Sequence, residues 1–235
     1  QTSFVVPSKA GVSLRATIWK PSNAQAPEPA LPAIILVHQW SMMGGQASLM
    51  YGIAHELNER GLHVVTFDMR GVGGSSGHKT INGQDEVRDV EAVCEWAHER
   101  LGMDLVLLGS SAGAPVAGSA IDFRPYIRAY VGVGYVFGLL SSVIFWPHYK
   151  AVLRSSKPRL FIQGTEDGYT SPAQLQSKLD KMSGVVEKHL VPGVGHFELE
   201  GPDYDSLVAR LAVDFVRRHA AGPGPGAGAG GGGAG

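Results

Sequence analysis

Short apolar runs alternate along the chain with longer segments in which apolar residues recur every three or four positions. The longer segments predict helices with one buried face, and the short runs, rich in β-branched residues, predict strands covered on both sides. Strands that alternate with helices are typical of a parallel sheet joined by crossover helices. The predicted strands cover residues 33–38, 62–67, 105–108, 129–133, 159–163 and 187–191, and the predicted helices cover 46–59, 85–100, 112–121, 173–182 and 204–218.

The two ends of the chain have different patterns. In residues 4–7 and 12–19 apolar and polar residues alternate, which predicts an antiparallel pair of strands at the edge of the sheet. Residues 220–235 contain only Gly, Ala and Pro, and such residues have little side-chain area to bury. We therefore expect one domain over residues 1–219, followed by a disordered tail.

The run 129–146 is uncharged and comes near the length of a membrane span. It contains Gly132, Gly134, Gly138, Ser141 and Ser142, and the alternating pattern requires a strand at this point. We therefore expect a strand followed by an apolar surface helix or loop, and no transmembrane span.

Composition narrows the classes of function. Lys and Arg number 20 and Asp and Glu 21, so the formal net charge is 20 − 21 = −1, whereas a nucleic-acid binder usually has a basic excess. Cys94 is the only cysteine of the sequence, which excludes an internal disulfide and a thiolate metal cluster. No spacing among His, Cys, Asp and Glu is typical of a metal site, so no metal is expected.

The motif that most clearly indicates a catalytic activity is Gly109-Ser110-Ser111-Ala112-Gly113, a G-x-S-x-G sequence. Ser111 follows a predicted strand and opens a helix of small residues, the strand–turn–helix context that exposes a nucleophilic hydroxyl. Residues 73–77 match the same pattern around Ser75, but a loop follows them. We therefore predict Ser111 as the nucleophile.

A serine hydroxyl needs a base to accept its proton and an acid to orient that base. Asp167 and His196 each lie just past a predicted strand, at the sheet edge from which Ser111 emerges. We predict His196 as the base and Asp167 as the acid. Glu166 remains an alternative acid, and the loop histidines His78 and His148 remain alternative bases.

With these residues the chain resembles the α/β-hydrolases, in particular the small uncharacterised α/β-hydrolase proteins of plants and green algae. Residues 68–75 resemble the family's D-x-R-G-x-G-x-S loop, and the loop around Asp167 resembles its acid-bearing loop. The resemblance implies an α/β-hydrolase fold: a mostly parallel twisted sheet with helices on both faces. Residues 134–158 must contain a crossover helix, which leaves no room for a substantial cap domain.

The resemblance also implies an oxyanion hole. One backbone amide would come from Ala112 and a second from Gln39 or Trp40, in a loop that departs from the family pattern because Gln39 replaces a glycine. His38 is expected to have a structural role. The apolar residues Met42, Met43, Phe137 and Trp146, together with Phe145, are candidate substrate-binding residues.

These observations predict a serine hydrolase that needs no cofactor and cleaves a small or short-acyl ester or thioester. The expected partner is a small-molecule acyl substrate. Two alternatives remain open: an acyltransferase that uses the same acyl-enzyme, and a non-catalytic binding protein on the same fold. Peptidase activity also remains open, because amides and esters share the chemistry.

Overall fold

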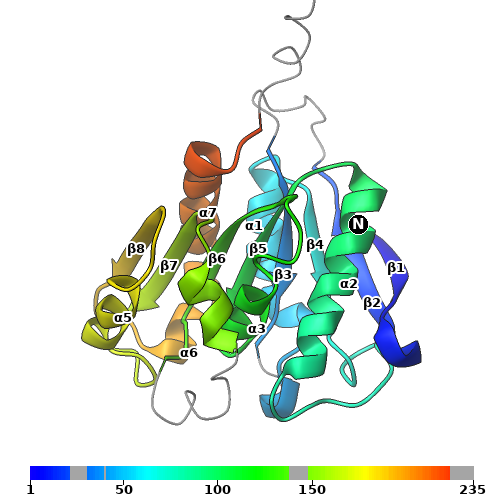
Figure 1. The fold of residues 1–235 in the computed structure, drawn as a ribbon, viewed down its shortest axis with the longest axis horizontal. Helices are drawn as coiled ribbons and strands as arrows, with labels where there is room; N and C mark the ends of the chain where they lie inside the picture. Colours follow the sequence, from blue (N-terminus) through cyan, green and yellow to red (C-terminus); the bar gives the residue numbers. More distant parts are fainter. Residues whose placement is uncertain (22–30, 40, 138–147, 223–235) are drawn as a thin grey trace, which may run out of the picture.

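The computed structural model describes residues 1–21, 31–39, 41–137 and 148–222. These residues form one eight-stranded sheet in the order β1-β2-β4-β3-β5-β6-β7-β8 (Figure 1). Strands β3 to β8 run parallel to one another, whereas β2 is antiparallel to both β4 and β1, so that β1 and β2 form an antiparallel edge. The strands are β1 (Thr2–Pro7), β2 (Ser13–Trp19), β3 (Ala33–Val37), β4 (Val64–Phe67), β5 (Leu105–Ser110), β6 (Ile127–Val133), β7 (Arg159–Gly164) and β8 (Val186–Val191).

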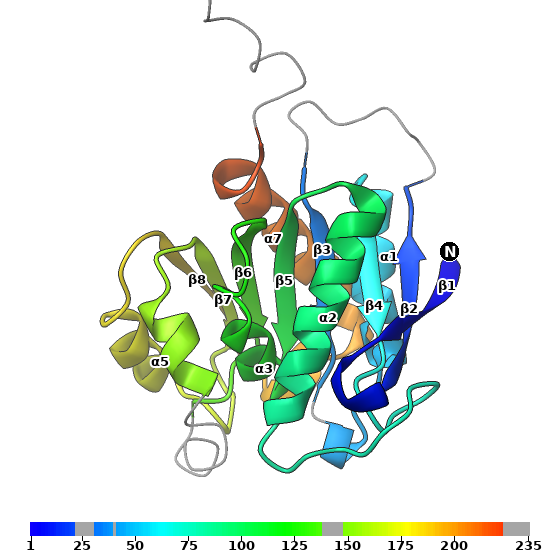
Figure 2. The same cartoon turned by 45° about the vertical axis from the view of Figure 1, so that its right-hand side comes forward.

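Helices cover both faces of this sheet, as Figures 1 and 2 show. Helices α2 (Gln84–Leu101) and α3 (Gly113–Ser119) lie on one face, and α1 (Tyr51–Glu59) and α7 (Asp205–His219) lie on the other. The apolar positions of α2 that recur every three or four residues, such as Val90, Val93 and Ala97, are buried. The two faces therefore contain two separate hydrophobic cores, one on each side of the strands.

The expected fold class is confirmed: the sheet is mostly parallel and has the predicted antiparallel edge. Several boundaries differ from the predicted ones. The segment 46–59 is divided into a 3₁₀ turn, η3 (Ala47–Met50), and α1, and α3 is shorter than its predicted range. Other short elements were not predicted: η1 (Lys9–Gly11), η2 (Ser41–Met43), α6 (His196–Leu199) and η4 (Pro202–Tyr204).

The segment after β6 is described in part. Residues 134–137 and 148–158 belong to the described chain, and 148–154 are helical. No helix within the described ranges is both long and apolar enough to cross a bilayer. The tail predicted for 220–235 lies outside the described residues from position 223 on.

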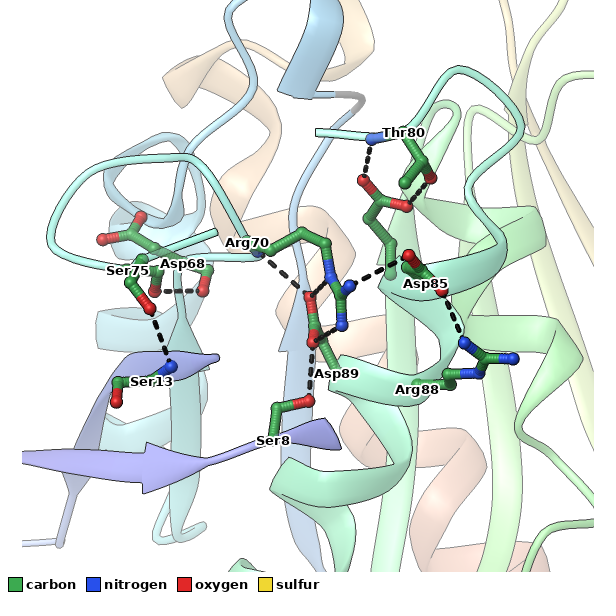
Figure 3. Close-up of polar contacts among 11 residues, drawn as sticks. Ser8, Ser13, Asp68, Arg70, Ser75, Thr80, Asp85, Arg88 and Asp89 are labelled. Atoms are coloured by element: carbon green, nitrogen blue, oxygen red, sulfur yellow. Dashed lines mark hydrogen bonds and ion pairs between the residues drawn. The ribbon is translucent and has the colours of Figure 1, made fainter. Parts of the chain in front are cut away.

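The loop after β4 is fixed by polar side chains, and Figure 3 shows the contact between Ser75 and Asp68 within it. Asp68 accepts hydrogen bonds from the backbone N–H groups of Ala47 and Gly74, at 2.9 and 3.3 Å. Ser75 Oγ donates to the Asp68 carbonyl at 2.6 Å and accepts from the Arg15 N–H at 2.8 Å. The second G-x-S-x-G match is therefore a turn whose serine hydroxyl is engaged on both sides.

A buried ion pair joins this loop to α2 and to the N-terminal hairpin (Figure 3). Arg70 donates from Nε and Nη2 to the Asp89 carboxylate, at 2.9 and 2.7 Å. Ser8 Oγ donates to the same carboxylate at 2.8 Å, and the Asp89 side chain is fully buried. Hydrogen bonding to Asp89 raises the pKa of the Arg70 guanidinium.

Candidate active site

Ser111 stands at a sharp turn between the end of β5 and the start of α3. Its φ is 52°, a left-handed conformation that non-glycine residues seldom adopt. The flanking glycines permit this turn, because a Cβ on Gly109 would lie 2.7 Å from the Ala114 Cα and one on Gly113 would lie 2.0 Å from the His38 carbonyl oxygen. Close approach of α3 to β5 and to the loop after β3 therefore explains both glycines of the motif.

His196 lies directly beside the Ser111 hydroxyl. It is the first residue of α6, which follows β8 and lies at the lower edge of the molecule in Figure 1. His196 Nε2 is 2.7 Å from Ser111 Oγ. The imidazole packs against Gly134, where an added Cβ would lie 3.3 Å from His196 Cε1. The alternative bases lie elsewhere: His78 is exposed, and His148 contacts Ser119 Oγ and the Asn82 carbonyl.

The Asp167 carboxylate contacts the other nitrogen of the His196 imidazole. Its Oδ2 is 2.6 Å from His196 Nδ1, and the Asp167 side chain is fully buried. Its Oδ1 accepts from the backbone N–H groups of Tyr169 and Thr170, at 2.7 and 2.9 Å. Because a carboxylate can only accept, the His196 proton lies on Nδ1 and leaves Nε2 free to accept the Ser111 proton. The neighbouring Glu166 is exposed.

Two aromatic rings border the imidazole, and both are exposed. The Tyr169 ring centroid is 4.5 Å from that of His196, and the Phe197 ring meets the imidazole edge to face at 5.3 Å. Phe197 is 67% exposed and Tyr169 41%. Large apolar side chains beside a reactive group are suited to contact a partly apolar substrate.

The loop after β3 contains the candidate second oxyanion donor. His38 Nδ1 lies 2.7 Å from the Gln39 carbonyl oxygen and donates to it, and His38 Nε2 accepts from the Met69 N–H at 3.1 Å. Burial lowers the pKa of His38 to about 4, so the ring is neutral. His38 thus orients the start of this loop. Trp40 lies outside the described residues, and Ala112 is the N-cap residue of α3, next to Ser111.

The predicted substrate-binding residues have different environments. Met42 is 48% exposed. Phe137 is buried, and its ring stacks on Tyr135 at 4.0 Å, so it belongs to the core instead of to an open pocket wall. Phe145 and Trp146, and the side chain of Met43, lie outside what the structure describes.

Three residues near the site had no motif to identify them: Tyr169, Phe197 and Glu200. The two aromatic residues flank Asp167 and His196 in the sequence, so their position follows once those residues are chosen. Glu200 is brought to Ser110 by the short helix α6, and no sequence spacing indicates that contact.

Within the ranges that the structure covers, no group of three His, Cys, Asp or Glu residues could hold a metal ion.

Comparisons of sequence give distant relatives. A family model for X-Pro dipeptidyl-peptidases of the S15 family matches residues 10–117. The chain is 24% identical over 183 residues to an uncharacterised protein of Rickettsia prowazekii, which aligns 74% of this chain with 75% of that protein. It is 30% identical over 191 residues to an uncharacterised protein of Mycobacterium tuberculosis strain H37Rv, of which 65% is aligned with 74% of this chain.

Comparisons of structure cover nearly the whole chain. A serine hydrolase homologue from Coxiella burnetii superposes with a TM-score of 0.74 at 24% identity, over 93% of this chain and 97% of that one. An α/β serine hydrolase without lid from Xanthomonas campestris gives 0.75 at 23%, over 94% and 96%. The esterase Pf2001 of Pyrococcus furiosus gives 0.74 at 17%, over 94% and 93%.

These similarities support the α/β-hydrolase fold and give no support to the narrower likeness to plant and green-algal proteins. The extent of superposition, with TM-scores of 0.74 and 0.75 over 93% and 94% of this chain, leads to one conclusion. The chain has the fold of the α/β-hydrolase superfamily.

Proposed function

We propose that the protein is a serine hydrolase that cleaves a carboxylic ester or thioester through an acyl-enzyme on Ser111. The observation that carries the proposal is the unbroken chain of short contacts from Ser111 Oγ to His196 Nε2, at 2.7 Å, and from His196 Nδ1 to Asp167, at 2.6 Å. A nucleophile within hydrogen-bond distance of a base, itself oriented by a buried acid, is the arrangement that activates a serine.

In the first half of the reaction, Ser111 Oγ attacks the carbonyl carbon while its proton passes to His196 Nε2. The bond to the leaving group then breaks, and His196 gives that proton to the leaving oxygen or sulfur. Asp167 keeps its negative charge throughout and stabilises the imidazolium. Water repeats the sequence in the second half, and the acid and free Ser111 are released.

The carbonyl oxygen becomes negative during each half of the reaction. We propose that the backbone N–H of Ala112 donates to it, together with one N–H from Gln39 or Trp40. Support for this assignment comes from the position of Ala112 at the start of α3 and from the close approach of Gly113 to the His38 carbonyl, which places the two loops side by side.

Substrates with short acyl chains suit this site best. The residues 134–158 that join β6 to β7 are few, and the Xanthomonas campestris relative is described as lacking a lid. An open site leaves the far end of a long acyl chain in water. Each methylene that stays in water loses about 0.8 kcal/mol of binding free energy that burial would provide. Tyr169, Phe197 and Met42 provide exposed apolar contacts for the near end.

A peptidase is the second candidate, because the matching family model is that of X-Pro dipeptidyl-peptidases. Its match includes Ser111 and ends before Asp167 and His196. An amide would be cleaved by the same steps, with His196 protonating a leaving nitrogen.

Labelling with a fluorophosphonate probe, in competition with substrates, tests these proposals together. We expect labelling of the wild type and of S75A, and none of S111A. Competition by acyl esters or thioesters supports the first proposal, whereas competition by X-Pro dipeptide amides alone would favour the peptidase. Product analysis with an added alcohol separates a hydrolase from an acyltransferase. A wild-type protein that resists the probe would refute the assignment of Ser111.

A further inference from the structure

A further carboxylate lies close to the three residues Ser111, His196 and Asp167, but it takes no part in the hydrogen bonds that join them. Glu200 follows α6 directly, four positions after His196 in the sequence. Ser110 Oγ donates to Glu200 Oε1 at 2.5 Å, and Ser110 is the last residue of β5, next to the nucleophile. One short side-chain contact therefore joins the turn that contains Ser111 to the helix that contains His196.

The same carboxylate lies near a third element. The Gln39 side chain is close enough to Glu200 to lower the pKa of its carboxyl group, and Gln39 lies in the loop that is proposed to supply the second oxyanion donor. Glu200 is thus the point at which the ends of β3 and β5 and the C-terminal end of α6 meet.

The charges that face Glu200 are those of the proposed catalytic residues. When protonated, His196 attracts its negative charge, whereas the Asp167 carboxylate repels it. Burial raises the pKa of Glu200, and the hydrogen bond from Ser110 offsets this only in part. Because burial raises the pKa of this carboxyl group, its ionisation lowers the free energy of unfolding. A contribution to stability therefore does not explain why a glutamate stands at this position.

We infer that Glu200 is a positioning residue that holds the Ser111 turn against the His196 helix and, as a carboxylate, favours the imidazolium formed when Ser111 loses its proton. The inference rests on the proposed function. Glu200 itself neither gives nor takes a proton in this step, because the Ser111 proton moves to His196 Nε2 while the bond from Oγ to the acyl carbon forms.

Two substitutions separate the hydrogen bond from the charge. In E200Q the amide oxygen still accepts from Ser110, but the negative charge is gone. In E200A both are lost. Asp203→Asn is the matched control, because it removes one negative charge from the neighbouring turn η4, at an exposed position.

The measurements are kcat and KM for p-nitrophenyl acetate from pH 5 to 9, and the melting temperature at pH 8. For E200Q we expect the acid limb of kcat/KM to move about 0.5 unit to lower pH, kcat to fall about 5-fold and the melting temperature at pH 8 to stay level or rise. For E200A we expect a further loss of about tenfold in kcat, because the Ser111 turn is no longer held. D203N should match the wild type.

A structural role alone gives a different pattern. If E200Q and E200A both lowered the melting temperature and left the acid limb unmoved, the inference would be overturned. The pH titration of the His196 ring, followed by NMR in wild type and E200Q without substrate, measures the same electrostatic effect. An unmoved midpoint there also overturns the inference, even if every ester proves inert and the proposed function fails.

Discussion

Replacement of Asp167 by Asn tests the arrangement of the site at the point where the structure constrains it most. Oδ1 of Asp167 accepts two backbone N–H groups, from Tyr169 and Thr170. An asparagine must therefore keep its oxygen at that position, because its NH₂ group would face two donors. The NH₂ group then points to His196 Nδ1, which can only accept from it, and the ring proton moves to Nε2. In that tautomer His196 cannot take the Ser111 proton.

The expected size of the effect follows from this geometry. An imidazole held in the wrong tautomer lowers kcat about 10⁴-fold, which corresponds to about 5.5 kcal/mol in activation free energy. The stability of the folded protein should change much less than its activity. The two backbone N–H groups keep an acceptor, so the free energy of unfolding should fall by only about 1–2 kcal/mol as charge-assisted bonds become neutral ones.

Steady-state hydrolysis of p-nitrophenyl acetate measures the first quantity, and urea unfolding measures the second. Glu166→Gln is the matched control, because it removes the same charge at the adjacent exposed position. The reasoning is refuted if D167N keeps more than a tenth of the wild-type kcat. A loss of activity in E166Q, with D167N active, would identify Glu166 as the acid.

Four further outcomes are expected. Ser111→Ala should lower kcat about 10⁵- to 10⁶-fold, whereas Ser75→Ala should leave kcat within a few-fold; equal losses in both variants would contradict the choice of motif. Burial lowers the pKa of His38 to about 4 from an ordinary 6.5, so the folded protein binds fewer protons than the unfolded chain between these values, and about 3 kcal/mol of stability that is present above pH 6.5 is lost as the pH falls toward 4. Urea unfolding as a function of pH checks this, and a His38→Asn variant should show a flatter dependence over that interval. Arg70→Ala should lower the free energy of unfolding by about 3–5 kcal/mol, because it leaves the Asp89 carboxylate buried without its cation; a loss below 1 kcal/mol in urea unfolding would show that this carboxylate is not buried in solution. On p-nitrophenyl esters kcat/KM should be highest at about two to six acyl carbons, and a maximum at twelve or more would point to an acyl-binding surface that the proposed open site does not include.

The fold and the three central residues could be predicted because each left a local signal. Strands such as 33–37 and 105–110 are buried on both faces, so their composition is nearly continuous in apolar residues. Ser111, Asp167 and His196 each follow such a strand, and the carboxyl ends of parallel strands meet at one edge. Sequence order and strand position were therefore enough to bring them together.

Contacts between loops could not be predicted in the same way. The bond from Ser110 to Glu200 depends on the direction in which α6 leaves β8, and a four-residue helix leaves no apolar period to detect. Phe137 was misjudged for a related reason. Its apolar character suits a pocket wall and a core equally well, and only the packing of Tyr135 against it shows that it belongs to the core.

Under the proposed function, the left-handed backbone of Ser111 makes activity and stability favour different residues at this position. A side chain at φ 52° costs on the order of 1 kcal/mol relative to glycine, so an inactive S111G variant should unfold at a higher temperature than S111A. Selection for thermal resistance alone would then tend to replace the proposed nucleophile, and any screen for stable variants of this protein must measure turnover as well as thermal resistance. The same trade-off makes S111G a useful inactive form in which to trap an uncleaved substrate.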